Sequence, residues 1–158
     1  MGLGICLVVL VAAAWNHYVG QGPRGEWQID GVGVSVSDLR VRDSFGAESE
    51  ITHPALILLF REDCRFCRSA RVRLNSFLQE APFRTIPVYA ILRAGPIPDS
   101  VISSFDPMIR VAAVADGHPG LGFVGALPLF VRTGGDGSII ATYLGIASDA
   151  VLRELMAV

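Results

Sequence analysis

Two cysteines, Cys64 and Cys67, lie three positions apart in the run Cys64-Arg65-Phe66-Cys67. In thiol–disulfide exchange one thiolate attacks a disulfide and a second thiol resolves the mixed disulfide that forms. The hydrophobic pattern around the pair predicts that Cys64 opens a helix, where unpaired backbone N–H groups favour a thiolate. The spacing then places Cys67 one turn on, on the same helix face. We expect Cys64 to be the exposed attacking thiol and Cys67 the partly buried resolving thiol.

Two other roles are open to the same pair. As half of a zinc site it would need about two more ligands, and the remaining candidates, His53 and His118, are far apart in the sequence. As a purely structural disulfide it would close a very short loop, which removes little entropy from the unfolded chain. Exchange chemistry fits better, and it needs neither a metal nor an organic cofactor because the two thiols carry the two electrons.

The elements that must position the pair follow from the spacing of apolar residues. The continuous apolar run at 55–60 has the length of a strand buried on both faces. Apolar residues then recur at helical spacing from Cys67 to Leu78, and Pro82 ends that pattern. The sequence therefore predicts a strand, the cysteine pair and a helix in direct succession.

The rest of the chain continues the alternation. A strand at 86–92, a short helix at 99–105 and a strand at 111–114 are predicted next. Strands at 129–132 and 139–144 are joined by a glycine-rich turn, which is a strong hairpin signal. Ser148 or Asp149 caps a last helix. Helical crossovers make the first strands parallel and the hairpin adds an antiparallel pair, so we expect an α/β fold around a central mixed sheet.

The N-terminal segment is almost wholly apolar from residue 3 to residue 19. At about 1.5 Å per residue this run lies at the short end of what spans a bilayer, and Trp15 and Tyr18 lie where an aromatic belt is expected. A cleaved signal peptide is the competing interpretation, although the usual basic n-region is missing, and a longer N-terminus is a third. We predict a membrane anchor or signal segment at 1–20, a tether at 21–31 and one globular domain at 32–158.

Composition excludes several functions. Charged residues make up 18 % of the chain and the net charge is −2, so the clustered basic residues of a nucleic-acid-binding protein are missing. Every basic residue is Arg, which excludes covalent catalysis by lysine. Apolar residues reach 51 % and the mean hydropathy is +0.48, which supports a well-buried core.

These motifs resemble the thioredoxin superfamily, and within it the membrane-anchored bacterial thiol–disulfide proteins of the TlpA and ResA kind. The resemblance covers roughly residues 32–158 and rests on the strand at 56–60, the cysteine motif, the run 126–130 and the turn 135–137. It implies a thioredoxin-like fold in which a cis-proline faces the dithiol, and Pro128 matches that proline. Leu127 would then offer its backbone edge to a substrate, beside Arg65 and Phe66.

The chain also departs from that pattern. Asp63 stands where the family commonly has Trp, and Leu58 stands where thioredoxin has a buried acid six residues before the first cysteine. The carboxylate that aids proton transfer from the resolving thiol is therefore missing from its usual position. Asp63 and Arg65 place opposite charges beside Cys64, so the redox direction is left open.

The resemblance implies a thiol–disulfide oxidoreductase that exchanges disulfides with cysteines of a partner protein. It implies a membrane-anchored domain on the periplasmic or other extracytoplasmic side of a bacterial membrane, and a separate redox partner for the electrons. One alternative is a non-catalytic docking module in which Cys64 and Cys67 form a structural disulfide. Another is a peroxiredoxin-type peroxidase, but Arg61 stands where those enzymes usually have Thr. His118 precedes Pro128 by a few residues and is more typical of a surface loop.

Overall fold

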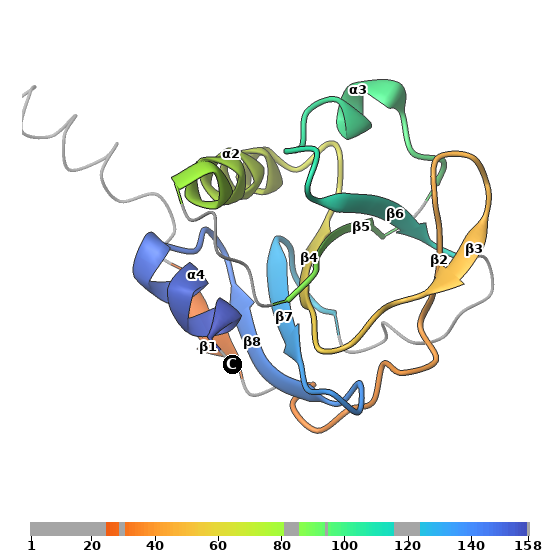
Figure 1. Ribbon diagram of the computed structural model, residues 1–158. Helices are drawn as coiled ribbons and strands as arrows, with labels where there is room; N and C mark the ends of the chain where they lie inside the picture. The colour runs from red at the N-terminus through yellow and green to blue at the C-terminus, as the bar shows by residue number, and fades with distance from the viewer. Residues whose placement is uncertain (1–24, 29–30, 81–85, 94, 116–123, 158) are drawn as a thin grey trace, which may run out of the picture.

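The structure is a computed structural model that describes residues 25–28, 31–80, 86–93, 95–115 and 124–157. Its described residues form one eight-stranded sheet and three helices (Figure 1). The strands follow the order β1-β8-β7-β4-β5-β6-β2-β3 across the sheet. Their bounds are β1 Glu26–Gln28, β2 Arg40–Arg42, β3 Glu48–Glu50, β4 Leu56–Phe60, β5 Val88–Leu92, β6 Arg110–Val114, β7 Leu129–Thr133 and β8 Ile139–Leu144, and those of the helices are α2 Arg65–Glu80, α3 Asp99–Ile102 and α4 Asp149–Met156.

The sheet is mixed, as the order of elements predicted. β4 pairs in parallel with β5, and β5 in parallel with β6. β7 pairs antiparallel with β4 on one side and with β8 on the other. Leu58, in the middle of β4, is therefore flanked by Ala90 of β5 and Phe130 of β7. This central position buries β4 on both faces and explains its continuous apolar sequence.

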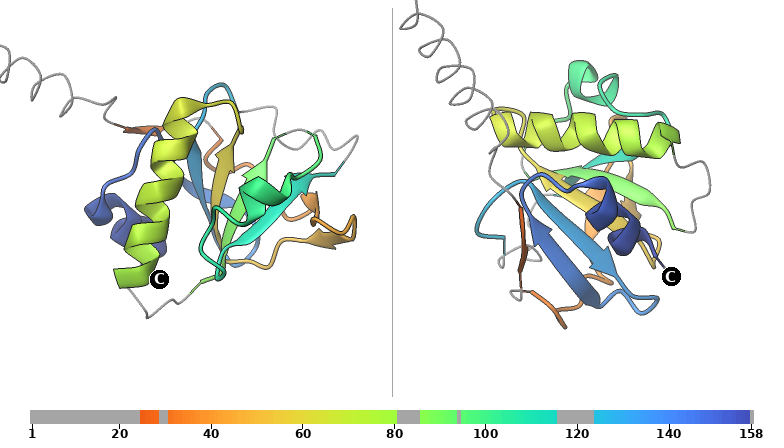
Figure 2. Two further views of the ribbon diagram at one scale, coloured as in Figure 1. Left: turned by 90° about the horizontal axis from the view of Figure 1, so that it is seen from above. Right: turned by 90° about the vertical axis from the view of Figure 1, so that its left-hand side faces the viewer.

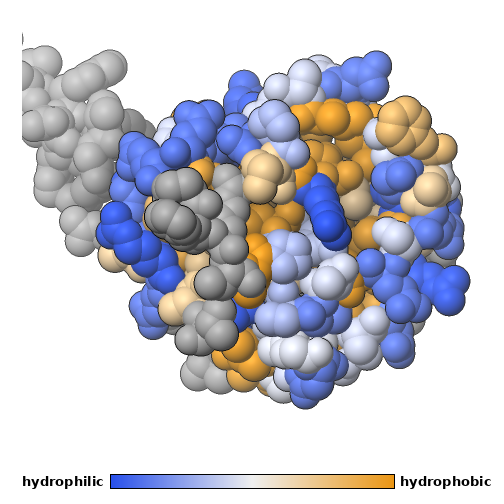
Figure 3. Space-filling view, in the orientation of Figure 1, coloured by the Kyte–Doolittle hydropathy of each residue, from blue (hydrophilic) through white to orange (hydrophobic). Residues whose placement is uncertain are grey.

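Alternate residues of β4 enter two separate hydrophobic clusters. Leu56, Leu58 and Phe60 pack with the buried faces of α2, α3 and α4, whereas Ile57 and Leu59 pack on the opposite face. That second face is covered by non-helical segments around 36–39, 51–55 and 124. Figure 2 shows α2 lying across the sheet, with α3 beside it and α4 near the β8 side. Hydrophobic side chains reach the surface in the area between α2 and β6 (Figure 3).

Polar contacts hold α2 against its neighbours. Asn75 donates to the carbonyl of Ser104 at 2.9 Å and accepts from the backbone N–H of Asp106 at 3.0 Å. Arg73 forms an ion pair with Asp149 of α4 at 3.0 Å. The hydroxyl of Ser148 accepts from the N–H of Val151 and caps α4, which agrees with one of the two predicted caps. The contacts of Arg73 and Asn75 come from the same stretch of α2 and tie it to α4 on one side and to the segment after α3 on the other.

The structure adds strands that the hydrophobic pattern did not predict. Glu26–Gln28, inside the range predicted as a tether, forms β1 and pairs antiparallel with β8. Glu48–Glu50 forms β3 at the opposite edge, and all three of its residues are exposed. The predicted anchor at 1–20 lies outside the described residues. Within the described residues, no helix combines the length and the apolar character needed to cross a membrane.

Candidate active site

Cys64 and Cys67 lie where β4 passes into α2. Cys64 directly precedes the helix and is half-buried, whereas Cys67 lies in the first turn and is 2 % exposed. Both are free thiols. The backbone N–H of Cys67 donates to the Cys64 sulfur at 3.2 Å. Since the first N–H groups of a helix have no partner within it, this contact gives Cys64 a donor that stabilises negative charge on its sulfur.

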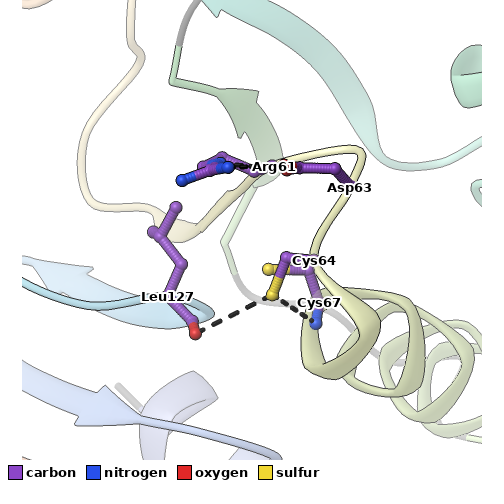
Figure 4. Close-up of polar contacts among 5 residues, drawn as sticks. All are labelled: Arg61, Asp63, Cys64, Cys67 and Leu127. Atoms are coloured by element: carbon purple, nitrogen blue, oxygen red, sulfur yellow. Dashed lines mark hydrogen bonds and ion pairs between the residues drawn. The ribbon is translucent and has the colours of Figure 1, made fainter.

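The segment before β7 approaches the dithiol from the other side. The peptide bond between Leu127 and Pro128 is cis, and the Leu127 carbonyl oxygen lies 3.9 Å from the Cys64 sulfur (Figure 4). The Pro128 carbonyl accepts from the N–H of Gly145 at 2.8 Å, which ties this segment to the loop after β8. Leu127, Pro128 and Cys64 are thus brought together although 63 positions separate Leu127 from Cys64.

The Cys67 thiol resists ionisation in the reduced protein. Burial raises its pKa to about 12, with further contributions from the hydrogen bond and the charge of Cys64. A hydrogen bond with the Arg61 backbone and the Arg61 charge act in the opposite direction and lower that pKa. The two contributions from Cys64 disappear once Cys64 is bonded to another sulfur. Cys67 therefore ionises more readily in a mixed disulfide than in the free dithiol.

Arg61 and Asp63 form an ion pair on the loop that carries Cys64 (Figure 4). The Arg61 Nε donates to the Asp63 carboxylate at 3.0 Å, and the Arg61 guanidinium holds the pKa of Asp63 below its usual value. The Asp63 charge beside the dithiol is thus offset by its neighbour. In the sequence, Arg61 argued only against a peroxidase; its pairing with Asp63 and its effect on the pKa of Cys67 are visible only in the structure.

The departures noted in the sequence have clear structural settings. Leu58 is fully buried in the cluster under α2. Within the described part of the chain, the charged groups that act on the pKa of Cys67 are Arg61 and Cys64, and no carboxylate is among them. The Arg65 guanidinium lies 4.6 Å from the centre of the Phe66 ring. Arg65 is exposed and Phe66 is partly exposed, so both are accessible at the rim of the dithiol.

A cleft of about 910 Å³ opens next to the β4–α2 loop. One wall carries Arg61 and Asp63, and the other is formed by the end of β5 and the loop toward α3. The cleft lies at the carboxyl ends of β4 and β5, which is where α/β sheets commonly bind ligands. Its lining is Arg61, Glu62, Asp63, Leu92, Arg93, Gly95, Pro96 and Pro98.

Of the two histidines considered as zinc ligands, the structure describes His53, and it is not at this site. His53 lies before β4, and its Nδ1 is 2.8 Å from the Thr133 hydroxyl. Burial is the main cause that lowers its pKa. His118 lies outside the described residues. Over the part of the chain that the structure describes, no group of three or more His, Cys, Asp or Glu residues is arranged to hold a metal.

Comparisons with known proteins agree with this architecture at low sequence identity. No protein-family model matches the sequence, and no curated protein matches it either. A thio-disulfide isomerase from Thermus thermophilus is similar in structure, with a TM-score of 0.56 and 18 % identity over 73 % of this chain and 87 % of that one. A secreted disulfide oxidoreductase of Mycobacterium tuberculosis, described as homologous to E. coli DsbE, has a TM-score of 0.57 and 18 % identity over 74 % and 92 %.

A third similar structure is a putative thiol:disulfide interchange protein DsbE from Chlorobium tepidum. It has a TM-score of 0.60 and 13 % identity over 82 % of this chain and 96 % of that one. Identities in this range carry the fold and not the activity. The likeness confirms the thioredoxin-like α/β fold with a central mixed sheet that the sequence predicted.

Proposed function

We propose that this protein is a thiol–disulfide oxidoreductase that exchanges its Cys64–Cys67 dithiol or disulfide with cysteines of a partner protein. The observation that carries the proposal is the geometry of the dithiol. A half-exposed sulfur lies at a helix start, opposite a cis-proline segment, with a buried second thiol one turn away. Each of these features serves a step of exchange.

The exchange proceeds in two displacements that conserve electrons. The Cys64 thiolate attacks one sulfur of a partner disulfide, forms a mixed disulfide and releases the other sulfur as a thiolate. Cys67 then gives up its proton to solvent or to the released thiolate and attacks the Cys64 sulfur. The partner leaves with two thiols and the protein keeps a Cys64–Cys67 disulfide. The reverse sequence oxidises a partner dithiol, and a separate redox partner resets the protein in either direction.

The residues around Cys64 orient the partner. The Leu127 carbonyl faces the Cys64 sulfur, so an extended partner segment that pairs with this backbone places its own sulfur close to Cys64. Because Pro128 has no backbone N–H, it offers the partner no donor at this position. Arg65 and Phe66 contact the partner from the helix side.

The cellular setting is also part of the proposal. We place the domain on the extracytoplasmic side of a bacterial membrane and assign residues 1–20 as its anchor, on the strength of the apolar run at 3–19. The similar protein from Mycobacterium tuberculosis is described as secreted. Carbonate extraction of membranes that hold the full chain tests the anchor. Release of the intact chain into the soluble fraction would contradict it.

The sharpest test of exchange traps the mixed disulfide. In Cys67→Ser the resolving thiol is missing, so we expect covalent complexes with partner proteins that dithiothreitol releases. The matched control is the double variant Cys64→Ser, Cys67→Ser, which should trap nothing. If Cys67→Ser forms no complex with any disulfide-bonded protein or peptide, Cys64 does not attack substrates and the proposal fails.

A docking module with a structural disulfide is the second candidate, favoured by Leu58 in place of a buried acid. The two candidates differ in the reduction potential of the Cys64–Cys67 pair. Exchange proteins span roughly −270 to −120 mV, whereas structural disulfides lie below about −300 mV. Equilibration with defined glutathione ratios measures this value. A potential inside the first range supports exchange, and its position shows whether the protein acts as a reductant or an oxidant.

A further inference from the structure

A groove of about 540 Å³ runs along the exposed side of α2. Its helix wall is a stripe of α2 residues from Arg65 to Ser76, in which gaps of three positions alternate with gaps of one. Such spacing places residues on one side of a helix. Ile146, in the loop between β8 and α4, is on the opposite wall. The full lining is Arg65, Arg68, Ser69, Val72, Arg73, Ser76 and Ile146.

The charge of this lining is positive, although the chain as a whole carries −2. Three of the seven lining residues are arginines and none is acidic. Arg73 is neutralised by its ion pair with Asp149. Arg65 contacts the Phe66 ring, and Arg68 is exposed without an ion pair to any described residue. Two positive charges in the groove are therefore uncompensated by the described protein.

Each wall of the groove adjoins, along the chain, a segment that holds the dithiol or contacts the cis-proline. Arg65 directly follows Cys64 in the chain. Ile146 follows Gly145, whose N–H donates to the Pro128 carbonyl at 2.8 Å. Both walls thus begin at the rim where Leu127 faces the Cys64 sulfur. From residue 65 to residue 76 a helix rises about 17 Å, at about 1.5 Å per residue, which is the length of about five residues of extended chain.

We propose that this groove binds acidic residues that flank the reactive cysteine of the partner, so that partners with acidic neighbours react fastest. The inference rests on the proposed exchange function and adds a class of substrate to it. A protein segment fits the groove better than a membrane does, because the groove is concave. It also combines its charges with the apolar side chains of Ile146 and of Val72, which is 59 % exposed.

The test uses three matched peptides, each with a single cysteine held in a disulfide with thionitrobenzoate. The cysteine is flanked on both sides by Glu in the first peptide, by Gln in the second and by Lys in the third. The reduced protein transfers two electrons to this disulfide, becomes the Cys64–Cys67 disulfide and releases the peptide thiol and coloured thionitrobenzoate. Stopped-flow absorbance gives a second-order rate constant for each peptide, and uncharged hydroxyethyl disulfide normalises each variant for the reactivity of Cys64.

For the unaltered protein we expect the Glu peptide to react about tenfold faster than the Lys peptide at low ionic strength, since charges at a binding rim act mainly on association. That preference should fall as salt is added. Arg68→Glu should remove or invert it. Arg40→Glu makes the same charge change on β2, next to the β3 edge of the sheet and away from β8. This variant should keep the preference for the Glu peptide.

The outcomes separate this proposal from the one on which it rests. Release of thionitrobenzoate at equal rates from all three peptides overturns the groove proposal and leaves exchange in place. A preference that Arg68→Glu and Arg40→Glu reduce equally reflects net charge and also overturns it. Arg68-dependent sedimentation with phosphatidylserine vesicles, without a peptide preference, assigns the groove to lipid instead. If no peptide releases thionitrobenzoate, the exchange function itself fails.

Discussion

The two ends of the β4–β7 strand pair are built differently. Each end has a cis peptide bond before a proline, at His53–Pro54 and at Leu127–Pro128. At the first end, the Thr133 hydroxyl accepts from the N–H of Ala55 at 2.9 Å and contacts His53, and the Thr133 N–H donates to the Ala55 carbonyl. At the second end, the one side chain described as a partner of the Leu127 carbonyl is the Cys64 thiol, at the long distance of 3.9 Å.

The polar groups at the first end are satisfied within the fold, whereas the Leu127 carbonyl at the second end is left accessible to a partner. Buried polar groups that find partners within the fold stabilise it, and losing one partner costs free energy. A backbone group that faces a reactive sulfur at long range remains available to another molecule. We call the cluster of His53, Ala55 and Thr133 the closed end, and the region of Cys64, Cys67 and Leu127 the open end. Changes at one end should leave the other almost unaffected.

The largest expected effect is at the open end. Cys64→Ser removes the attacking sulfur, and a hydroxyl does not replace a thiolate as nucleophile. We expect the rate of disulfide exchange to fall by about a thousandfold or more, which is the scale of loss when an enzyme's nucleophile is removed. Thionitrobenzoate release measures it.

The same variant should unfold at nearly the same denaturant concentration as the reduced parent protein. A large loss of stability in Cys64→Ser would show that the open end also holds the fold together, and the comparison would then fail.

The next effect is at the closed end. Thr133→Val keeps the shape of the side chain but removes the hydroxyl that Ala55 and His53 contact. A buried donor left without a partner costs about 1–3 kcal/mol, so we expect the free energy of unfolding to fall by that amount. Urea unfolding followed by circular dichroism measures it.

Ser in place of Thr133 is the control, since it keeps the hydroxyl. The exchange rate of folded Thr133→Val should match that of the parent. A slower rate would mean that the two ends are coupled through β7.

A smaller effect is expected on the resolving step. The Arg61 charge lowers the pKa of Cys67, so Arg61→Gln should raise that pKa and leave less thiolate to attack the mixed disulfide. Because Arg61 is exposed, the effect is screened by solvent, and we expect the mixed disulfide to live about two to five times longer. Quenched-flow trapping with an alkylating agent measures this lifetime.

Arg93→Gln is the matched control, because Arg93 lines the same cleft and is not among the groups that act on the pKa of Cys67. Equal slowing in both variants would assign the effect to the cleft as a whole and not to the Arg61 charge.

The smallest effect is a pH dependence of the closed end. Burial lowers the pKa of His53 below 6.5 in the folded protein, so the unfolded chain takes up a proton first as the pH falls. The contribution of His53 to the free energy of unfolding is therefore fully present above about pH 6.5, and it is lost as the pH falls toward the pKa of His53 in the folded protein. His53→Asn should flatten the dependence of stability on pH in this range. An unchanged slope would show that His53 does not titrate on unfolding.

The sequence was sufficient for the elements with a strong pattern. The buried run of β4, the apolar stripe of α2 and the glycine-rich turn before β8 are local signals, and each element formed where it was predicted. β3 carries Glu, Ser and Glu with no buried side chain, so only its backbone pairing with β2 makes it a strand. No hydrophobic period marks such an edge strand.

The candidate site was only partly visible for the same reason. Cys64 and Cys67 lie three positions apart in the chain, and Pro128 was found by resemblance. The contact between His53 and Thr133 joins residues 80 positions apart, and the groove wall at Ile146 depends on how β8 turns into α4. Contacts of this kind follow from the folded arrangement and leave no local signal in either segment.

The direction of β1 sets how the domain is presented to its surroundings. Glu26 pairs with Leu144 and Gln28 with Thr142, so the chain enters the sheet beside the loop that holds Pro128. With residues 1–20 as the proposed anchor, the five residues 21–25 between the anchor and β1 could span at most about 18 Å, at about 3.3–3.6 Å per residue. The end of the domain that bears the dithiol would then face the bilayer. Its substrates would be proteins whose cysteines lie close to the lipid headgroups.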